Sequence, residues 1–251
     1  MKIVSNGGRP DLQGPAQASL RDGWPPFVLR GQIPATHRDA VAEYFPRYDV
    51  LLLDDDDTVL ARATAVALSW NGETLPDGGY DGALVAAVTE HEAGIGPDTL
   101  CVVAATVRTD RTGGGLAGKV LTGLRERAAD DGLARVIVPV RPTLKATYPL
   151  TPMEDFQRWT REDGLHLDPW IRTHQRLGAT ILGPAPRSMV VTGTVAQWER
   201  WTGMVFPQTG RYVVAGGLDL VRIDRERDQG LYEETNLWMR HPNAECPLIA
   251  R

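Results

Sequence analysis

The sequence predicts an α/β fold with a mixed, mostly antiparallel sheet, a central splayed parallel strand pair, flanking helices and an extra C-terminal β-hairpin. Three observations predict it. The apolar run Thr99 to Val107 precedes a glycine-rich turn and an amphipathic helix, and a second apolar run follows, as in a strand–helix–strand unit. Two β-rich runs upstream flank an acidic turn. The C-terminal part of the chain has mostly antiparallel strand patterns.

The N-terminal part of the chain is expected to hold an arm, a helix and a hairpin. Residues 1–23 are rich in Gly, Pro and Gln without periodicity, and we expect a flexible N-terminal arm. Thr36 is a candidate cap for the helix that follows it. Tyr48–Leu53 and Val59–Trp70 form a predicted antiparallel hairpin. The aspartates between them, Asp54 to Asp57, could bind a cation, but a solvated turn explains them better because metal ligands are usually separated by specific spacers.

The centre of the chain carries the strongest patterns. Tyr80 to Glu92 has helical spacing, and Thr99–Val107 is typical of a strand buried on both faces. After the glycine turn, apolar residues recur on one helical face up to Gly132. Ala134–Val140 then forms the second buried strand, which a right-handed crossover places parallel to the first or splayed from it.

The remaining elements are shorter. Asp168 is a candidate N-cap and Pro169 suits a first helical turn. We expect a helix over Pro169–Leu177, strands over Ala179–Leu182 and Ser188–Thr194, a helix over Val195–Trp201, and a hairpin of Arg211–Ile223 with Leu231–Met239. The proposed division is an arm over residues 1–23, a core over 24–194, and an extension of the same domain over 195–251.

Composition excludes several classes of function. Lys and Arg total 27 against 32 Asp and Glu, a net charge of −5, so no basic field favours nucleic acid as a partner. Cys101 and Cys246 are too few for a disulfide framework or a zinc cluster, which favours a reducing cytoplasm. The apolar runs are far shorter than the roughly 20 residues of a membrane span, and the N-terminus has no signal-like apolar region. We therefore expect a soluble, cytoplasmic protein with no membrane partner.

The glycine-rich turn Gly113–Gly118, followed by Lys119, matches parts of two nucleotide-binding motifs. A P-loop needs Ser or Thr after the lysine, and Val120 stands there. A dinucleotide fold needs an acidic residue after the next strand, which instead ends in Val140, Arg141 and Pro142. Backbone N–H groups at a helix start remain a site for a phosphate or pyrophosphate. A flexible turn with only a geometric role is the structural alternative.

The segment Val107–Gly118 resembles the acyl-CoA pyrophosphate loop of the GNAT superfamily of N-acyltransferases, Q/R-x-x-G-x-G/A. Gly115 and Ala117 match its last two small residues, Thr112 stands at the Gln/Arg position, and Arg111 lies one residue early. The order of elements over about Trp24 to Thr194 is also similar to that family. The resemblance implies acetyl-CoA or another acyl-CoA as co-substrate, with its pantetheine arm between the two splayed strands. The implied cofactor-binding residues are Thr106, Val107, Arg111, Thr112, Gly113, Gly114, Gly115, Leu116, Ala117, Gly118 and Lys119.

The resemblance also implies acid–base groups for attack of a small-molecule amine on the thioester. The family's usual acid is a tyrosine four residues before the glycine that closes the last core helix, and His174 stands there. A histidine could act as an acid near neutral pH, because its ordinary pKa is about 6.5; a histidine that only packs or caps is the structural alternative. Tyr148 is the substitute. Glu92 could act as a base through water, although a solvated helix end explains it equally well.

Three functions stay open. The first is an acyltransferase that moves an acetyl or other acyl group from CoA to a small amine. The second is a non-catalytic or repurposed acyl-CoA binder, because the central strand holds no carboxylate. The third is a protein with a degenerate P-loop or dinucleotide site. The C-terminal hairpin could extend the sheet or join a second subunit as a homodimer, and the long link between Arg141 and Asp168 could shape an acceptor pocket or add packing.

Overall fold

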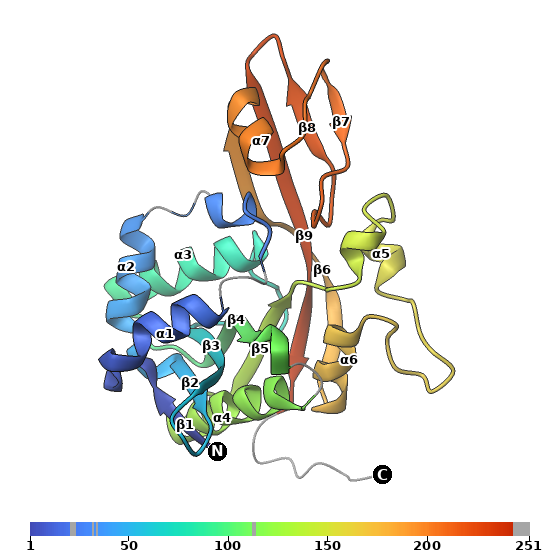
Figure 1. The fold of residues 1–251 in the computed structure, drawn as a ribbon. Coiled ribbons are helices and arrows are strands. Elements are labelled where there is room, and N and C mark those ends of the chain that lie inside the picture. Colours follow the sequence, from blue (N-terminus) through green and yellow to red (C-terminus); the bar gives the residue numbers. More distant parts are fainter. Residues whose placement is uncertain (21–23, 32, 34, 112–113, 243–251) are drawn as a thin grey trace.

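The computed structural model describes residues 1–20, 24–31, 33, 35–111 and 114–242 (Figure 1). Their strands form one sheet in the order β1-β2-β3-β4-β5-β9-β8-β7, with β6 pairing with β9. The strands are β1 Lys2–Ser5, β2 Asp49–Leu53, β3 Val59–Leu68, β4 Thr99–Val107, β5 Arg135–Val140, β6 Thr180–Gly193, β7 Gly210–Tyr212, β8 Val221–Asp224 and β9 Gln229–His241. The helices are α1 Pro10–Leu20, α2 Ala35–Tyr44, α3 Gly79–Glu92, α4 Leu116–Asp130, α5 Met153–Phe156, α6 Pro169–Arg176 and α7 Val195–Thr202. In this part of the chain, no helix is both long and apolar enough to cross a membrane.

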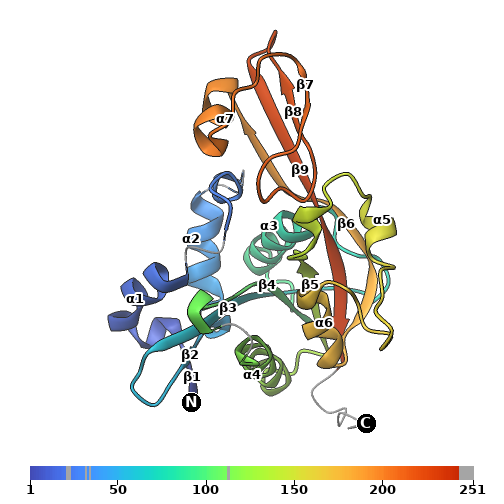
Figure 2. The same cartoon turned by 45° about the vertical axis from the view of Figure 1, so that its right-hand side comes forward.

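The predicted mixed sheet is confirmed. The β2–β3 hairpin is antiparallel, and β4 and β5 form the parallel pair of an otherwise antiparallel sheet. Helices α3 and α4 cover opposite faces of its centre, as Figure 2 shows. Asp168 caps α6 as predicted, since its carboxylate accepts hydrogen bonds from the N–H groups of Trp170 and Ile171. The α2 helix forms where expected, but it begins at Ala35, so Thr36 lies inside its first turn and is not the N-cap that was predicted.

The parallel pair splays because both strands are diverted. Pairing of β4 with β5 ends at Cys101 opposite Ile137. Beyond that point the β3–β4 register shifts between Thr64 and Ala65, so β4 carries an extra residue, and a bulge of this kind bends a strand. Pro139 in β5 has no N–H to offer to a ladder, and β5 stays paired with β9 on its other side from Val136 to Val140. A gap opens between the second halves of β4 and β5.

The prediction of a flexible arm is wrong for residues 1–20. Strand β1 pairs antiparallel with β2, and α1 packs Ala16 and Leu20 against Leu51 and Leu53. The physical reason is the composition of β2, whose side chains are buried on both faces of the sheet, so the face turned away from the main core also needs an apolar cover. Residues 21–23 lie outside the described residues. The division at Thr194 stays a prediction.

The C-terminal part differs in detail from the prediction. The two short strands expected over 179–194 are one long strand, β6, whose register against β9 shifts twice. The first half of the expected hairpin is two short strands, β7 and β8, of which β8 pairs with β9. A small second core lies here, around Trp198 and Tyr232. In Figure 1 this part projects from one end of the central sheet.

Candidate active site

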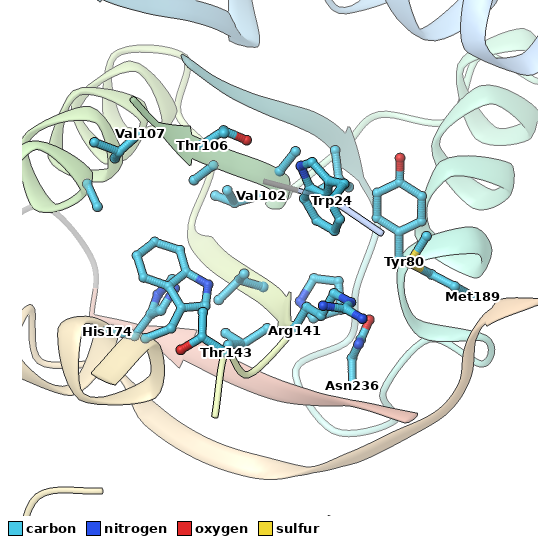
Figure 3. Close-up of a pocket in the computed structure, with 18 residues that line it drawn as sticks. Trp24, Tyr80, Val102, Thr106, Val107, Arg141, Thr143, His174, Met189 and Asn236 are labelled. Atoms are coloured by element: carbon cyan, nitrogen blue, oxygen red, sulfur yellow. The ribbon is translucent and has the colours of Figure 1, made fainter. Parts of the chain in front are cut away.

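A cavity of about 320 Å³ lies between the splayed strands. Its walls come from β4 and β5, from the first turn of α4, from α6, and from the segment around Trp24 (Figure 3). Apolar and aromatic side chains predominate, with a few polar groups among them, as is usual for a small-molecule site. The lining residues include Trp24, Tyr80, Val102, Thr106, Val107, Ala117, Val140, Arg141, Thr143, Trp170, His174, Met189 and Asn236.

Along the wall formed by β4, one edge of the strand is not paired with another described strand. Residues 102–107 lie beyond the last β4–β5 pair and line the cavity, so within the described part of the chain their main-chain groups on that side have no strand partner. Thr106 and Val107, predicted as cofactor-binding positions, are both in this stretch. Because an extended ligand can hydrogen-bond such an edge as an added strand would, this wall suits the amide-containing arm of an acyl-CoA.

The glycine turn lies beside this wall, at the start of α4. Gly115 is the N-cap residue, with the left-handed φ of 70° that favours glycine. A Cβ built on it would meet no atom of the described residues within 4 Å, so among these residues the space beside this backbone is open. Together with the free N–H groups of the first helical turn, this open backbone fits a pyrophosphate group.

The other predicted cofactor-binding residues lie in different places around the glycine turn. Ala117 lines the cavity, and Gly118 and Lys119 line a neighbouring groove that also includes Gly115 and Arg176. Arg111 and Gly114 are exposed near the turn, whereas Leu116 is buried in the core. The Leu116 side chain therefore packs α4 onto the core, and only the main chain of Leu116 can contact a ligand. Thr112 and Gly113 lie outside the described residues.

Sequence reasoning missed a buried polar network at the far end of the cavity. The Arg141 guanidinium Nε donates to both Glu234 carboxylate oxygens at 2.9 and 3.1 Å, and its Nη2 donates to the Gly216 carbonyl at 2.7 Å. The Tyr232 hydroxyl and the Asn236 amide also donate to Glu234, at 2.6 and 2.9 Å. Glu234 therefore accepts from three side chains and holds Arg141 and Asn236 in the cavity wall.

The signal for this network was present in β9. Tyr232, Glu234, Asn236 and Trp238 alternate along the strand and are all nearly fully buried, so they share one inward face. Two polar residues at such inward positions need partners, and an arginine directly after a buried strand supplies one.

His174 lines the cavity on α6, and its ring meets Trp170 edge to face. Its Nδ1 lies 2.8 Å from Nε2 of His241. Burial holds the pKa of His174 well below its ordinary value, and nearby His241 lowers it further. His174 is therefore neutral near pH 7. The expectation that it acts as an acid with an ordinary pKa needs correction, because a desolvated imidazole does not hold the extra proton.

The His174–His241 pair predicts a fall in stability at mildly acidic pH. Burial lowers the pKa of His241 to about 4, so below about pH 6.5 the unfolded chain binds a proton that the folded chain does not. Stability is therefore lost as the pH falls from 6.5 toward 4. At pH 5 the free energy of unfolding should be lower by about 2 kcal/mol from this group alone. Urea unfolding of the wild type and His241→Gln at pH 7 and pH 5 measures it. Equal pH dependence in both would contradict the expectation, and exposed His91→Gln is the control.

The other two predicted catalytic residues lie apart from the cavity lining. Tyr148 is 38% exposed and packs edge to face on Trp159, with ring centroids 4.8 Å apart. Glu92 is exposed at the C-terminal end of α3, where it accepts a hydrogen bond from Tyr44. Since Tyr80 at the start of α3 lines the cavity, a rise of ~1.5 Å per residue separates Glu92 from it by roughly 18 Å. Action of Glu92 on the cavity gains no support from this position.

Comparisons with known proteins agree with the fold. The chain is 27% identical over 246 residues to the arginine N-acetyltransferase avaD of Aspergillus versicolor, covering 87% of this chain and 85% of that protein. No protein-family model matches the chain.

Two solved structures share the fold along nearly the whole chain. The loading GNATL domain of CurA from Lyngbya majuscula has a TM-score of 0.57 at 12% identity and covers 98% of both chains. The GphF GNAT-like decarboxylase in complex with isobutyryl-CoA has a TM-score of 0.54 at 14% identity, covering 96% of this chain and 99% of that one. The splayed β4–β5 pair, the glycine turn and these likenesses together show that the chain has a GNAT-like fold.

Proposed function

We propose that this protein transfers an acyl group, most simply acetyl, from acyl-CoA to the amine of a small amino-acid-like acceptor such as arginine. The observation that carries the proposal is the cavity between β4 and β5, with an unpaired strand edge along one wall and the glycine turn beside it. The likeness to an arginine N-acetyltransferase over most of both chains supports an amine acceptor of this class.

For this acyl transfer, the main task of the protein is to hold the acceptor amine next to the thioester carbonyl. The acceptor's neutral amine attacks the thioester carbonyl, the C–N bond forms, and the C–S bond breaks as the CoA thiolate leaves and takes up a proton. Donors near the carbonyl oxygen stabilise the charge that develops on it, and unpaired main-chain N–H groups along residues 102–107 are suited to this. The neutral imidazole of His174 in the wall is in the right form to accept a proton from the amine.

The nucleotide-binding alternative loses its topological basis. In a doubly wound nucleotide fold the strand before the glycine turn lies in a parallel sheet, whereas β4 pairs antiparallel with β3 along its length and parallel with β5 at only three positions. Cytoplasmic location and a homodimer stay predictions.

The test of the proposed function is acceptor-dependent release of the CoA thiol. With acetyl-CoA and arginine, we expect thiol release that requires both substrates, and a product heavier by one acetyl group in mass spectrometry. Desulfo-CoA, which lacks the thiol and so cannot carry an acyl group, should compete with acetyl-CoA. Tight acetyl-CoA binding without thiol release over a panel of amines would favour the non-catalytic binder instead. No binding of acetyl-CoA would reject both.

A further inference from the structure

A second cavity of about 280 Å³ adjoins the first on the face of the sheet covered by α2 and α3. The two cavities share the walls formed by Trp24, Tyr80, Ala104 and Met189. Ala104 lies at the bulge in β4, next to the point where β4 and β5 separate. A molecule in the second cavity therefore reaches the first one across the bulge.

One wall of the second cavity carries a carboxylate without a cationic partner. Asp81, in the first turn of α3, accepts a hydrogen bond from the Val190 N–H at 3.0 Å. Among the described residues, no cation lies within ion-pair distance of it, whereas neighbouring Glu234 is paired with Arg141. Burial raises the pKa of Asp81 to about 6, as expected for a carboxylate that lacks a compensating charge.

Arg38 on α2 supplies the opposite charge. It lines the same cavity, and its Nη1 donates to the Ile33 carbonyl at 2.8 Å. No carboxylate in the described parts of the chain pairs with it. Both charges affect the pKa of the Tyr80 hydroxyl: burial raises this pKa, the Asp81 carboxylate raises it further, and the Arg38 guanidinium lowers it. The cavity thus has an anion and a cation at its wall, near the ring of Tyr80.

A free amino acid with a cationic side chain complements this arrangement. The guanidinium or ammonium group of such a ligand can form a charged hydrogen bond with the Asp81 carboxylate. The aromatic rings of Trp24 and Tyr80 also favour a neighbouring cation. The carboxylate of the amino acid can pair with Arg38. A neutral ligand would leave the partly buried Asp81 carboxylate without a charged partner, which is costly.

We propose that the second cavity is the acceptor site, in which Asp81 binds the cationic side chain of a basic amino acid and Arg38 binds its carboxylate. This inference rests on the proposed function and names the acceptor class and the residues that select it. The amine to be acylated then faces the first cavity across the β4 bulge.

The test is direct binding, which does not depend on turnover. Calorimetry with arginine, citrulline and agmatine is performed on the protein saturated with desulfo-CoA. Citrulline has nearly the shape of arginine without its side-chain charge, and agmatine lacks the carboxylate. Asp81→Asn keeps an acceptor for the Val190 N–H, so the fold is preserved, and we expect it to weaken arginine binding roughly 10- to 100-fold, as for the loss of a charged hydrogen bond. Citrulline binding should change little.

Arg38→Gln should weaken arginine binding by roughly tenfold or more and leave agmatine binding unchanged. Asp39→Asn, next to Arg38 on α2 but outside the lining of the second cavity, is the matched control and should behave as wild type. Equal losses for arginine and citrulline in Asp81→Asn, or unchanged arginine binding, would overturn the inference. If wild type acylates other amines but does not bind arginine, the acceptor inference fails while the proposed function stands. If arginine binds as expected but no amine is acylated, the proposed function fails instead.

Discussion

Replacing Gly115 by glutamate is expected to weaken acetyl-CoA binding by at least ~100-fold while the protein stays folded, because each 1.4 kcal/mol lost is tenfold in affinity. Gly115 precedes α4 with a left-handed φ, and the space beside it is open. A glutamate there would fill that space and place a negative charge where the helix N-terminus favours the pyrophosphate. A side chain in the left-handed conformation adds only about 1–2 kcal/mol of strain. Calorimetry with acetyl-CoA and desulfo-CoA, together with urea unfolding, measures both effects.

The other end of the same helix offers a matched control. Gly132 also has a left-handed φ, of 73° against 70° at Gly115, and a Cβ built on it likewise meets no atom within 4 Å. Gly132→Glu therefore imposes a comparable backbone strain and the same added charge, away from the glycine turn. It should bind acetyl-CoA as wild type does. Similar losses in both variants would mean that the effect comes from the fold, and unchanged binding in Gly115→Glu would remove the turn from the cofactor site.

The central unit could be predicted because its signals are local. The strand Thr99–Val107, the start of α4 after the glycine turn, and the cap at Asp168 each depend on residues adjacent in the sequence, and the structure has all three. Hydrophobic periodicity and capping chemistry report local structure directly. The cavity between β4 and β5 could be inferred only through the family resemblance.

The parts that sequence reasoning missed depend on distant partners. Strand β1 forms because β2 offers an edge, and α1 because β2 has a second apolar face, 30 or more residues away in the chain. The site likewise joins Arg141 after β5 to Glu234 in β9, and Asp81 on α3 to Val190 in β6. The alternation along β9 marks Glu234 as an inward polar residue that needs a partner, but no local pattern identifies which distant residue supplies it. His174 could be placed by the family pattern, yet its lowered pKa follows from burial against His241, which only the fold reveals.

The buried pair of Arg141 and Glu234 forms the wall between the cavity and the C-terminal strands. The Glu234 side chain is fully buried and that of Arg141 is 16% exposed. Arg141 also packs over the Trp24 ring, with the guanidinium carbon 5.8 Å from the ring centroid. Its loss would leave a carboxylate in the interior with only the neutral donors of Tyr232 and Asn236.

Arg141→Met should therefore lower the free energy of unfolding by about 3–5 kcal/mol, the usual effect of removing one partner of a buried ion pair. Urea unfolding at pH 7 measures it. Arg222→Met is the matched control, because Arg222 pairs with Glu233, the neighbour of Glu234 in β9. The Arg222 side chain, however, is 55% exposed, and Arg187 also contacts the Glu233 carboxylate. That variant should lose less than about 1 kcal/mol. Losses of similar size in the two variants would show that the Glu234 charge is compensated without Arg141, and that the cavity wall does not depend on this pair.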